Sequence, residues 1–80
     1  MTTLRRGDLE TGLGLVDTLV TTGLVPSKGR ARTTITQGGT YVNNRRITDA
    51  DARLGPDDLL FGRYLVLRRG QRDYHLLRFE

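Results

Sequence analysis

Residues 27–47, SKGRARTTITQGGTYVNNRRI, decide the fold of this chain and concentrate its charge. This stretch has five basic residues and no acidic one, within an 80-residue chain whose formal net charge is +4. The basic residues are Lys28, Arg30, Arg32, Arg45 and Arg46. A basic cluster built into a folded unit is the usual electrostatic signature of a nucleic-acid site. The alternative interpretation is a solvated charged surface, because arginine-rich surfaces are common.

The same stretch predicts a helix over residues 28–37. Ser27 is a residue type that caps helix N-termini, and Gly38-Gly39 supplies a glycine where the helix ends. Ala31 and Ile35 lie four residues apart, so they share the buried side of the helix. One flank of the helix consists of Lys28, Arg32 and Thr36. The other flank and the outer face consist of Arg30, Thr33 and Gln37.

Apolar spacing predicts another helix just before it, over residues 13–22. Its stripe is made by Leu15, Val16, Leu19 and Val20. Gly23 follows, where a left-handed C-cap residue is expected. Residues 1–12 have no such periodicity, and we expect them to be a flexible N-terminal tail or linker. The folded domain would then comprise residues 13–80.

Short strands are predicted after the helices. Residues 40–42 and 46–48 form strands around a tight turn at Asn43-Asn44-Arg45, because asparagine tolerates the positive φ that such turns need. Residues 63–69 and 74–79 form a hairpin around residues 70–73. Its expected pairs are Arg69 with Tyr74, Leu67 with Leu76 and Val66 with Leu77.

These elements predict a single α+β domain in which two short N-terminal helices pack on a small, mostly antiparallel β-sheet. The acidic connection between the strand pairs, residues 48–61, is expected to hold one helical turn over residues 56–60.

Residues with catalytic or metal-binding chemistry are few. The chain has no cysteine, which excludes disulfides and thiolate sites and fits a reducing cytoplasm. The single histidine, His75, lies within the last predicted strand without a nucleophile nearby in sequence. The aspartates of residues 49–58 lack the ligand spacing of a calcium loop. We therefore predict no catalytic residue, no metal site and no cofactor. No apolar run has the length of about 20 residues that a membrane span needs. The basic charge indicates an acidic partner, with RNA, DNA or an anionic membrane as candidates, and we expect RNA and no membrane.

The three tyrosines admit two interpretations. Tyr41, Tyr64 and Tyr74 could stack on the bases of a nucleic acid. Tyrosines in strands are also common as half-buried packing residues.

Two motifs resemble a known family. The residues Ser27-Lys28-Gly29-Arg30-Ala31-Arg32, Gln37-Gly38-Gly39 and Tyr41-Val42-Asn43-Asn44 resemble the alpha-L RNA-binding motif, the domain type of the small-subunit ribosomal protein S-four. Residues 59–70, LLFGRYLVLRRG, resemble the C-terminal domain of bacterial tyrosyl-tRNA synthetases, especially actinobacterial ones. The similarity covers about residues 13–79.

The resemblance implies a non-catalytic RNA-binding module, the tRNA-binding C-terminal domain of a cytoplasmic tyrosine–tRNA ligase whose catalytic part lies N-terminal to it. The implied partners are tRNA or other structured RNA and that catalytic part, and the isolated domain is expected to be a monomer. Arg30, Thr33, Thr34 and Thr36 depart from the family pattern. The expected RNA-binding residues are Ser27, Lys28, Arg30, Arg32, Thr33, Thr36, Gln37, Gly38, Asn43, Asn44, Arg45 and Arg46.

Two other functions remain open from the residues alone. The chain could be a free-standing RNA-binding protein of the same motif that acts on ribosomal RNA. It could also be a protein-interaction module whose basic face meets an acidic partner.

Overall fold

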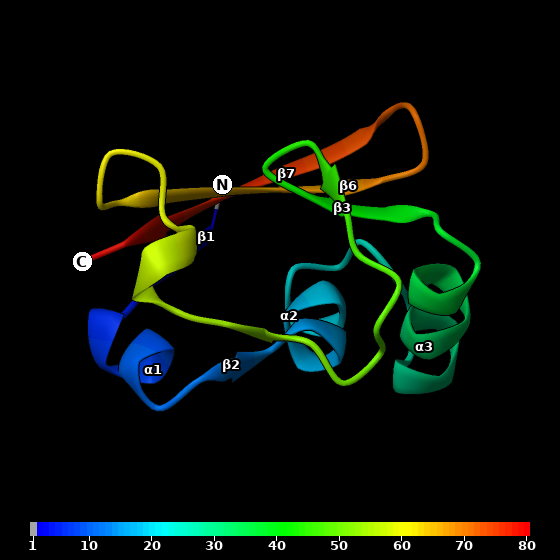
Figure 1. Ribbon diagram of the computed structural model, residues 1–80, viewed down its shortest axis with the longest axis horizontal. Coiled ribbons are helices and arrows are strands. Elements are labelled where there is room, and N and C mark those ends of the chain that lie inside the picture. Colours follow the sequence, from blue (N-terminus) through cyan, green and yellow to red (C-terminus); the bar gives the residue numbers. More distant parts are fainter. Residues whose placement is uncertain (1) are drawn as a thin grey trace.

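The chain folds into one layer of helices beneath a curved sheet (Figure 1). The computed structural model describes residues 2–80. The helices are α1 (Arg6–Glu10), α2 (Leu15–Thr21), α3 (Lys28–Thr36) and a 3₁₀ turn at Pro56–Asp58. The strands are β1 (Thr2–Leu4), β2 (Leu13–Gly14), β3 (Thr40–Val42), β4 (Arg45–Arg46), β5 (Arg53–Leu54), β6 (Tyr64–Arg69) and β7 (Asp73–Phe79).

The main sheet has the strand order β1-β7-β6-β3-β4. Among the strand pairs of this sheet in the described part of the chain, only β1–β7 is parallel, so the predicted α+β class with a mostly antiparallel sheet is confirmed. A single core lies between this sheet and the helices. Its fully buried side chains include Leu65, Leu67 and Leu77 of the sheet and Leu15, Leu19 and Ile35 of the helices.

The helix predicted within residues 28–37 is confirmed as α3. The Ser27 hydroxyl accepts a hydrogen bond from the backbone N–H of Arg30 at 3.2 Å, which is the expected N-cap contact. Ala31 and Ile35 are completely buried, as their spacing predicts. Gly38 has a φ of +78°, so it ends the helix in the left-handed conformation that glycine adopts without strain. Because its threonines and Gly29 are poor helix formers, packing of the buried edge stabilises α3.

The turn after β3 is shorter than predicted. Asn43 and Asn44 have φ values of +51° and +67°, and both belong to the turn. Arg45 instead pairs with Val42 and begins the returning strand. Two left-handed residues form a two-residue hairpin turn whose twist matches that of the flanking strands.

The prediction of a flexible tail over residues 1–12 is wrong for residues 2–12; Met1 lies outside the described residues. β1 pairs with β7, and Leu9 of α1 is only 1% exposed. A five-residue helix is too short to show a periodic stripe, so a single buried leucine anchors this segment. The next helix also begins later than predicted, at Leu15, because Leu13 and Gly14 pair with β5.

The predicted register of the last hairpin is wrong by one residue. Arg69 pairs with Asp73 rather than Tyr74, and Leu65 pairs with Leu77. The connecting loop therefore has the three residues 70–72, starting at Gly70 with a φ of +66°. The predicted register would have placed the charged Arg78 opposite the buried Leu65. A slip of one residue reverses the faces of a strand, so burial of the leucines selects the observed pairing.

Candidate nucleic-acid interface

Two of the three cations on α3 already have acidic neighbours. Lys28 Nζ lies 3.2 Å from a carboxylate oxygen of Asp17, and Arg32 Nη1 lies 3.6 Å from one of Asp51. All four side chains are more than half exposed, so these pairs contribute little to stability and exchange readily with solvent or a competing anion. Within residues 2–80, Arg30 forms no ion pair.

The two threonines predicted to contact RNA form hydrogen bonds to backbone carbonyls of α3 itself. Thr33 donates its hydroxyl proton to the Gly29 carbonyl at 3.1 Å, and Thr36 donates to the Arg32 carbonyl at 3.0 Å. Both hydroxyls keep acceptor capacity but use their donor within α3. Gln37, the C-cap residue of α3, is exposed beside Gly38.

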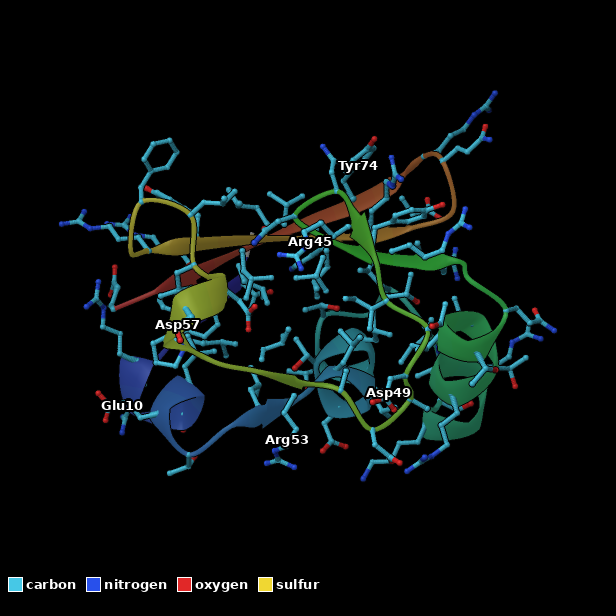
Figure 2. The ribbon with its side chains drawn as sticks, in the orientation of Figure 1. Glu10, Arg45, Asp49, Arg53, Asp57 and Tyr74 are labelled. Carbon is cyan, nitrogen blue, oxygen red and sulfur yellow. The ribbon has the colours of Figure 1, made fainter. Side chains whose placement is uncertain are left out.

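Arg45 and Arg46, adjacent in sequence, lie on opposite faces of the sheet. Arg45 pairs with the buried Val42, so its side chain lies on the helix side of the edge strand, where Figure 2 shows it. It lines a surface groove with Ile47, Asp57 and residues of the adjoining loop. Arg46 pairs with Tyr41 on the outer face, which no helix of residues 2–80 covers. The basic block in the sequence therefore becomes two separate basic surfaces.

Asn43 is a structural residue rather than an exposed contact. Its side-chain N–H donates to the Asp58 carbonyl at 2.6 Å, and its side-chain oxygen accepts from the Val66 N–H at 2.9 Å. The amide thus joins the β3–β4 turn to both β6 and the 3₁₀ turn. Asn44 is exposed at the tip of the turn, where its side chain is accessible.

The outer face carries an alternating row of arginine and tyrosine that only partly overlaps the predicted site. Arg46 donates to the Tyr41 hydroxyl, with its Nη2 at 2.9 Å. The guanidinium group of Arg68 lies over the Tyr41 ring, with its central carbon 3.8 Å from the ring centre. The same carbon lies 5.9 Å from the ring centre of Tyr74. These are cation–π distances, so the row Arg46–Tyr41–Arg68–Tyr74 crosses strands β4, β3, β6 and β7.

The electrostatics of the row agree with its geometry. The hydrogen bond from Arg46 lowers the pKa of Tyr41 below its usual value. Arg68 does not belong to the predicted set, and it meets Tyr41 because the two residues pair across β3 and β6. The sequence leaves two interpretations for the three tyrosines, base stacking and half-buried packing in strands. Tyr74 is 56% exposed, whereas Tyr41 and Tyr64 are half-buried.

The histidine lies in a structural setting. The Thr2 hydroxyl oxygen lies 2.7 Å from His75 Nε2 and links β1 to β7. Partial burial lowers the pKa of His75 below its usual value. Within residues 2–80, no three side chains of metal-binding type come together, and no helix is long and apolar enough to cross a membrane.

Comparison with known proteins gives consistent matches. Residues 3–77 match the family described as "Tyrosine--tRNA ligase SYY-like C-terminal domain". The chain is 61% identical over 59 residues to a tyrosine–tRNA ligase of Thermobifida fusca, a match that covers 74% of this chain and 14% of that protein. It is 47% identical over 77 residues to one of Roseiflexus castenholzii, covering 95% of this chain and 18% of that protein.

A solved structure matches the whole domain. The solution structure of a tyrosyl-tRNA synthetase C-terminal domain superposes with a TM-score of 0.71 at 37% sequence identity, covering 100% of this chain and 79% of that one. The likeness includes residues 2–12, which the sequence patterns alone had left outside the domain. The chain thus spans less than a fifth of the length of these curated relatives.

Proposed function

The chain belongs to the family of tyrosine–tRNA ligase C-terminal domains, and on this premise we propose that it is a non-catalytic module that binds tRNA for a parent ligase. The proposal extends to the cellular setting: a cytoplasmic ligase whose catalytic part precedes this domain and delivers tyrosine to the tRNA that the domain holds.

One observation supports RNA binding most directly. Arg30, Arg45, Arg46 and Arg68 form no ion pair within residues 2–80, although the chain has nine acidic residues. Unpaired guanidinium groups on a protein surface are well suited to bidentate contacts with phosphate oxygens. They lie on α3, on both faces of the β3–β4 hairpin and on β6. Cations on two surfaces of the domain suit contacts with separate parts of the sugar–phosphate backbone of a folded RNA.

The two cations of α3 that are paired with acidic neighbours form a second set of candidate phosphate contacts. Lys28 and Arg32 hold Asp17 and Asp51 only in exposed pairs. A phosphate carries more acceptor oxygens than a carboxylate and can replace it as the partner. The capped N-terminus of α3 adds a favourable dipole beside Lys28. We therefore assign phosphate contacts to both groups of cations.

The test is a competition experiment at several salt concentrations. tRNA is expected to bind more tightly than duplex DNA of equal length at physiological salt, because A-form geometry and 2′-hydroxyls are recognised by shape and backbone contacts. Four to six neutralised phosphates give a log–log salt slope of about −3 to −5. Equal affinity for tRNA and DNA would reduce the site to a nonspecific basic patch.

The same measurement separates the remaining interpretations. Tight binding to ribosomal RNA with weak binding to tRNA would favour a free-standing ribosomal RNA-binding protein. Absence of salt-dependent RNA binding would contradict the RNA function and favour a protein-interaction module. The family membership holds in either case, because it rests on the sequence match.

A further inference from the structure

The outer face of the main sheet, which no helix of the described residues covers, carries the Arg46–Tyr41–Arg68–Tyr74 row described above. Figure 2 shows Tyr74 standing above the sheet, on the side opposite the helices. Tyr74 is 56% exposed, although a tyrosine on a strand usually packs at least one face of its ring. Two further apolar side chains of this face, Val66 and Leu76, pair directly across β6 and β7. The row therefore combines exposed aromatic surface with fixed positive charge.

The arginines of this row differ in their partners from the other arginines of β6 and β7. Arg69 is paired with Asp73 at 2.6 Å, and Arg78 lies 3.4 Å from Glu80. Arg46 and Arg68 have tyrosines as neighbours instead and form no ion pair within residues 2–80. The strand residues of this face include no acidic side chain in the observed register. The row is thus complementary to an anionic ligand that also has a flat, aromatic part.

The row is also continuous with the proposed RNA-binding helix. The side chain of Arg46 packs against Gly38, where a Cβ atom would lie 3.4 Å from Arg46 Cδ. Arg46 therefore passes beside the end of α3 and reaches Tyr41 on the outer face. An RNA backbone bound along α3 has a direct path onto the sheet at this point.

We propose that the Arg46–Tyr41–Arg68–Tyr74 row is a stacking site for an unpaired nucleotide of the bound RNA. The inference rests on the proposed RNA function and names a second part of the interface. The base stacks on the exposed ring of Tyr74, because the Tyr41 ring is already covered by Arg68. Arg68 and Arg46 contact the adjoining phosphates, and Tyr41 holds both guanidinium groups in position.

An unpaired nucleotide fits this surface better than a base-paired one. Bases inside an A-form helix stack on one another, and side chains cannot enter its deep, narrow major groove. A base in a loop or bulge has a free π-face and a flexible backbone that can follow the row. Stacking on tyrosine is tolerant of sequence, so this site would select unpaired structure rather than one base.

The test uses two RNA hairpins with the same stem, one fully paired and one with a single bulged 2-aminopurine nucleotide. The bulged hairpin is expected to bind the wild-type domain about fivefold more tightly or better, and stacking should quench its fluorescence. Tyr74→Leu removes the aromatic ring but keeps a strand-forming apolar side chain. It should abolish both the preference and the quenching, whereas Tyr74→Phe should keep them.

Arg68→Gln tests the phosphate contacts of the row. It should weaken binding of the bulged hairpin more than that of the paired hairpin and flatten the salt slope for the bulged one by about one unit. Arg5→Gln is the matched charge control, because Arg5 is exposed and precedes α1 at the opposite end of the molecule. It should leave the ratio between the two hairpins unchanged. Thermal melts of all variants would show whether each remains folded.

The outcomes separate this inference from the proposed function. Salt-dependent binding of both hairpins with no preference, or a preference unaffected by Tyr74→Leu, would overturn the stacking site and leave RNA binding intact. Failure of both hairpins and of tRNA to bind would overturn both. An effect of Tyr74→Leu on association with the catalytic part of a parent ligase, without an effect on RNA, would reassign the row to a protein contact and overturn the inference.

Discussion

Asn43 and Val66 hold each other by two hydrogen bonds: the backbone N–H of Asn43 donates to the Val66 carbonyl at 2.8 Å, and its side-chain oxygen accepts from the Val66 N–H at 2.9 Å. This pair fastens the β3–β4 turn to the centre of the sheet. The side-chain amide of Asn43 also donates to the carbonyl of Asp58. One residue thus fixes the position of the basic hairpin relative to β6.

Asn43→Ala should therefore lower stability rather than act directly on RNA affinity. It removes both side-chain hydrogen bonds and leaves two partly buried backbone groups without partners, at a cost of about 1–3 kcal/mol. The loss would appear as a lower midpoint in urea unfolding. Asn44→Ala is the matched control, since it also places alanine at a positive φ, and Asn44 is exposed. A stable Asn43→Ala domain would contradict the role of the amide.

Ser27→Ala should lower the stability of the domain by about 1 kcal/mol, because the alanine cannot accept the hydrogen bond from Arg30. In a domain of this size, that loss lowers Tm by roughly 4–8 °C. Ser27→Asn should keep most of the stability, since asparagine also caps helices. Equal melting temperatures for Ser27→Ala and Ser27→Asn would show that the cap contributes nothing.

Asp17→Asn and Asp51→Asn should each tighten tRNA binding. Each change removes a carboxylate that competes with phosphate for Lys28 or Arg32. The expected gain is a few-fold at low salt and should shrink as salt rises, because exposed charges are screened. Glu10→Gln makes the same change of charge at the far end of the molecule, where Figure 2 shows Glu10. An equal gain for Glu10→Gln would reduce the effect to net charge.

Arg46→Gln should flatten the log–log salt slope of tRNA binding by about one unit and weaken binding to many RNAs alike. Arg46 is exposed, and its outward position beside Gly38 lets it meet the RNA backbone. Arg5→Gln offers a comparison, because Arg5 is exposed and precedes α1, which Figure 1 shows at the end of the molecule opposite α3. An unchanged slope for Arg46→Gln would place the RNA elsewhere on the surface.

Acid should weaken the fold through His75. Its pKa is lower in the folded protein than the usual value near 6.5, so the unfolded chain binds the proton more tightly. The neutral ring therefore supports the fold above pH 6.5, and that contribution is lost as the pH falls through the folded pKa. His75→Gln should make Tm less dependent on pH just below about 6.5, where carboxylates have not yet titrated. Parallel Tm curves for the wild type and His75→Gln would contradict this assignment.

The sequence could predict the parts of the fold that depend on strong local signals. The α3 cap at Ser27, its buried edge at Ala31 and Ile35, and the left-handed glycine after it all follow from residue type and spacing. The paired asparagines likewise predict a turn. In each case the residues that carry the signal lie close together in the sequence, so the prediction does not depend on contacts with distant parts of the chain.

Other parts depend on contacts between distant residues and could not be predicted locally. Leu9 becomes a core residue only because α1 packs beneath the sheet, and β1 exists only beside β7. The hairpin register depends on which side of β7 the helices cover, a property of the assembled fold. Loop composition allowed either three or four residues between the strands.

The candidate site was predicted as one basic block and divides into two surfaces for a simple reason. Side chains alternate along a strand, so Arg45 and Arg46 cannot share a face. The same alternation brings Arg68 to Tyr41 from a strand more than 20 residues away, a meeting that charge counts along the sequence do not reveal. Asn43 was assigned to RNA from the family resemblance, whereas its hydrogen bonds give it a structural task.

The parallel pairing of β1 with β7 determines how the domain bears mechanical load. Thr2 lies beside Leu77, and Leu4 lies beside Phe79, so the first and last strands run side by side in the same direction. The backbone of residue 80 adds two more hydrogen bonds, from Glu80 N–H to Leu4 and from Arg6 N–H to Glu80. Tension applied between the two ends shears all of these bonds together instead of opening them one after another. A pulling force transmitted between the two ends would therefore have to break the hydrogen bonds between β1 and β7 together before it disturbed the basic surfaces.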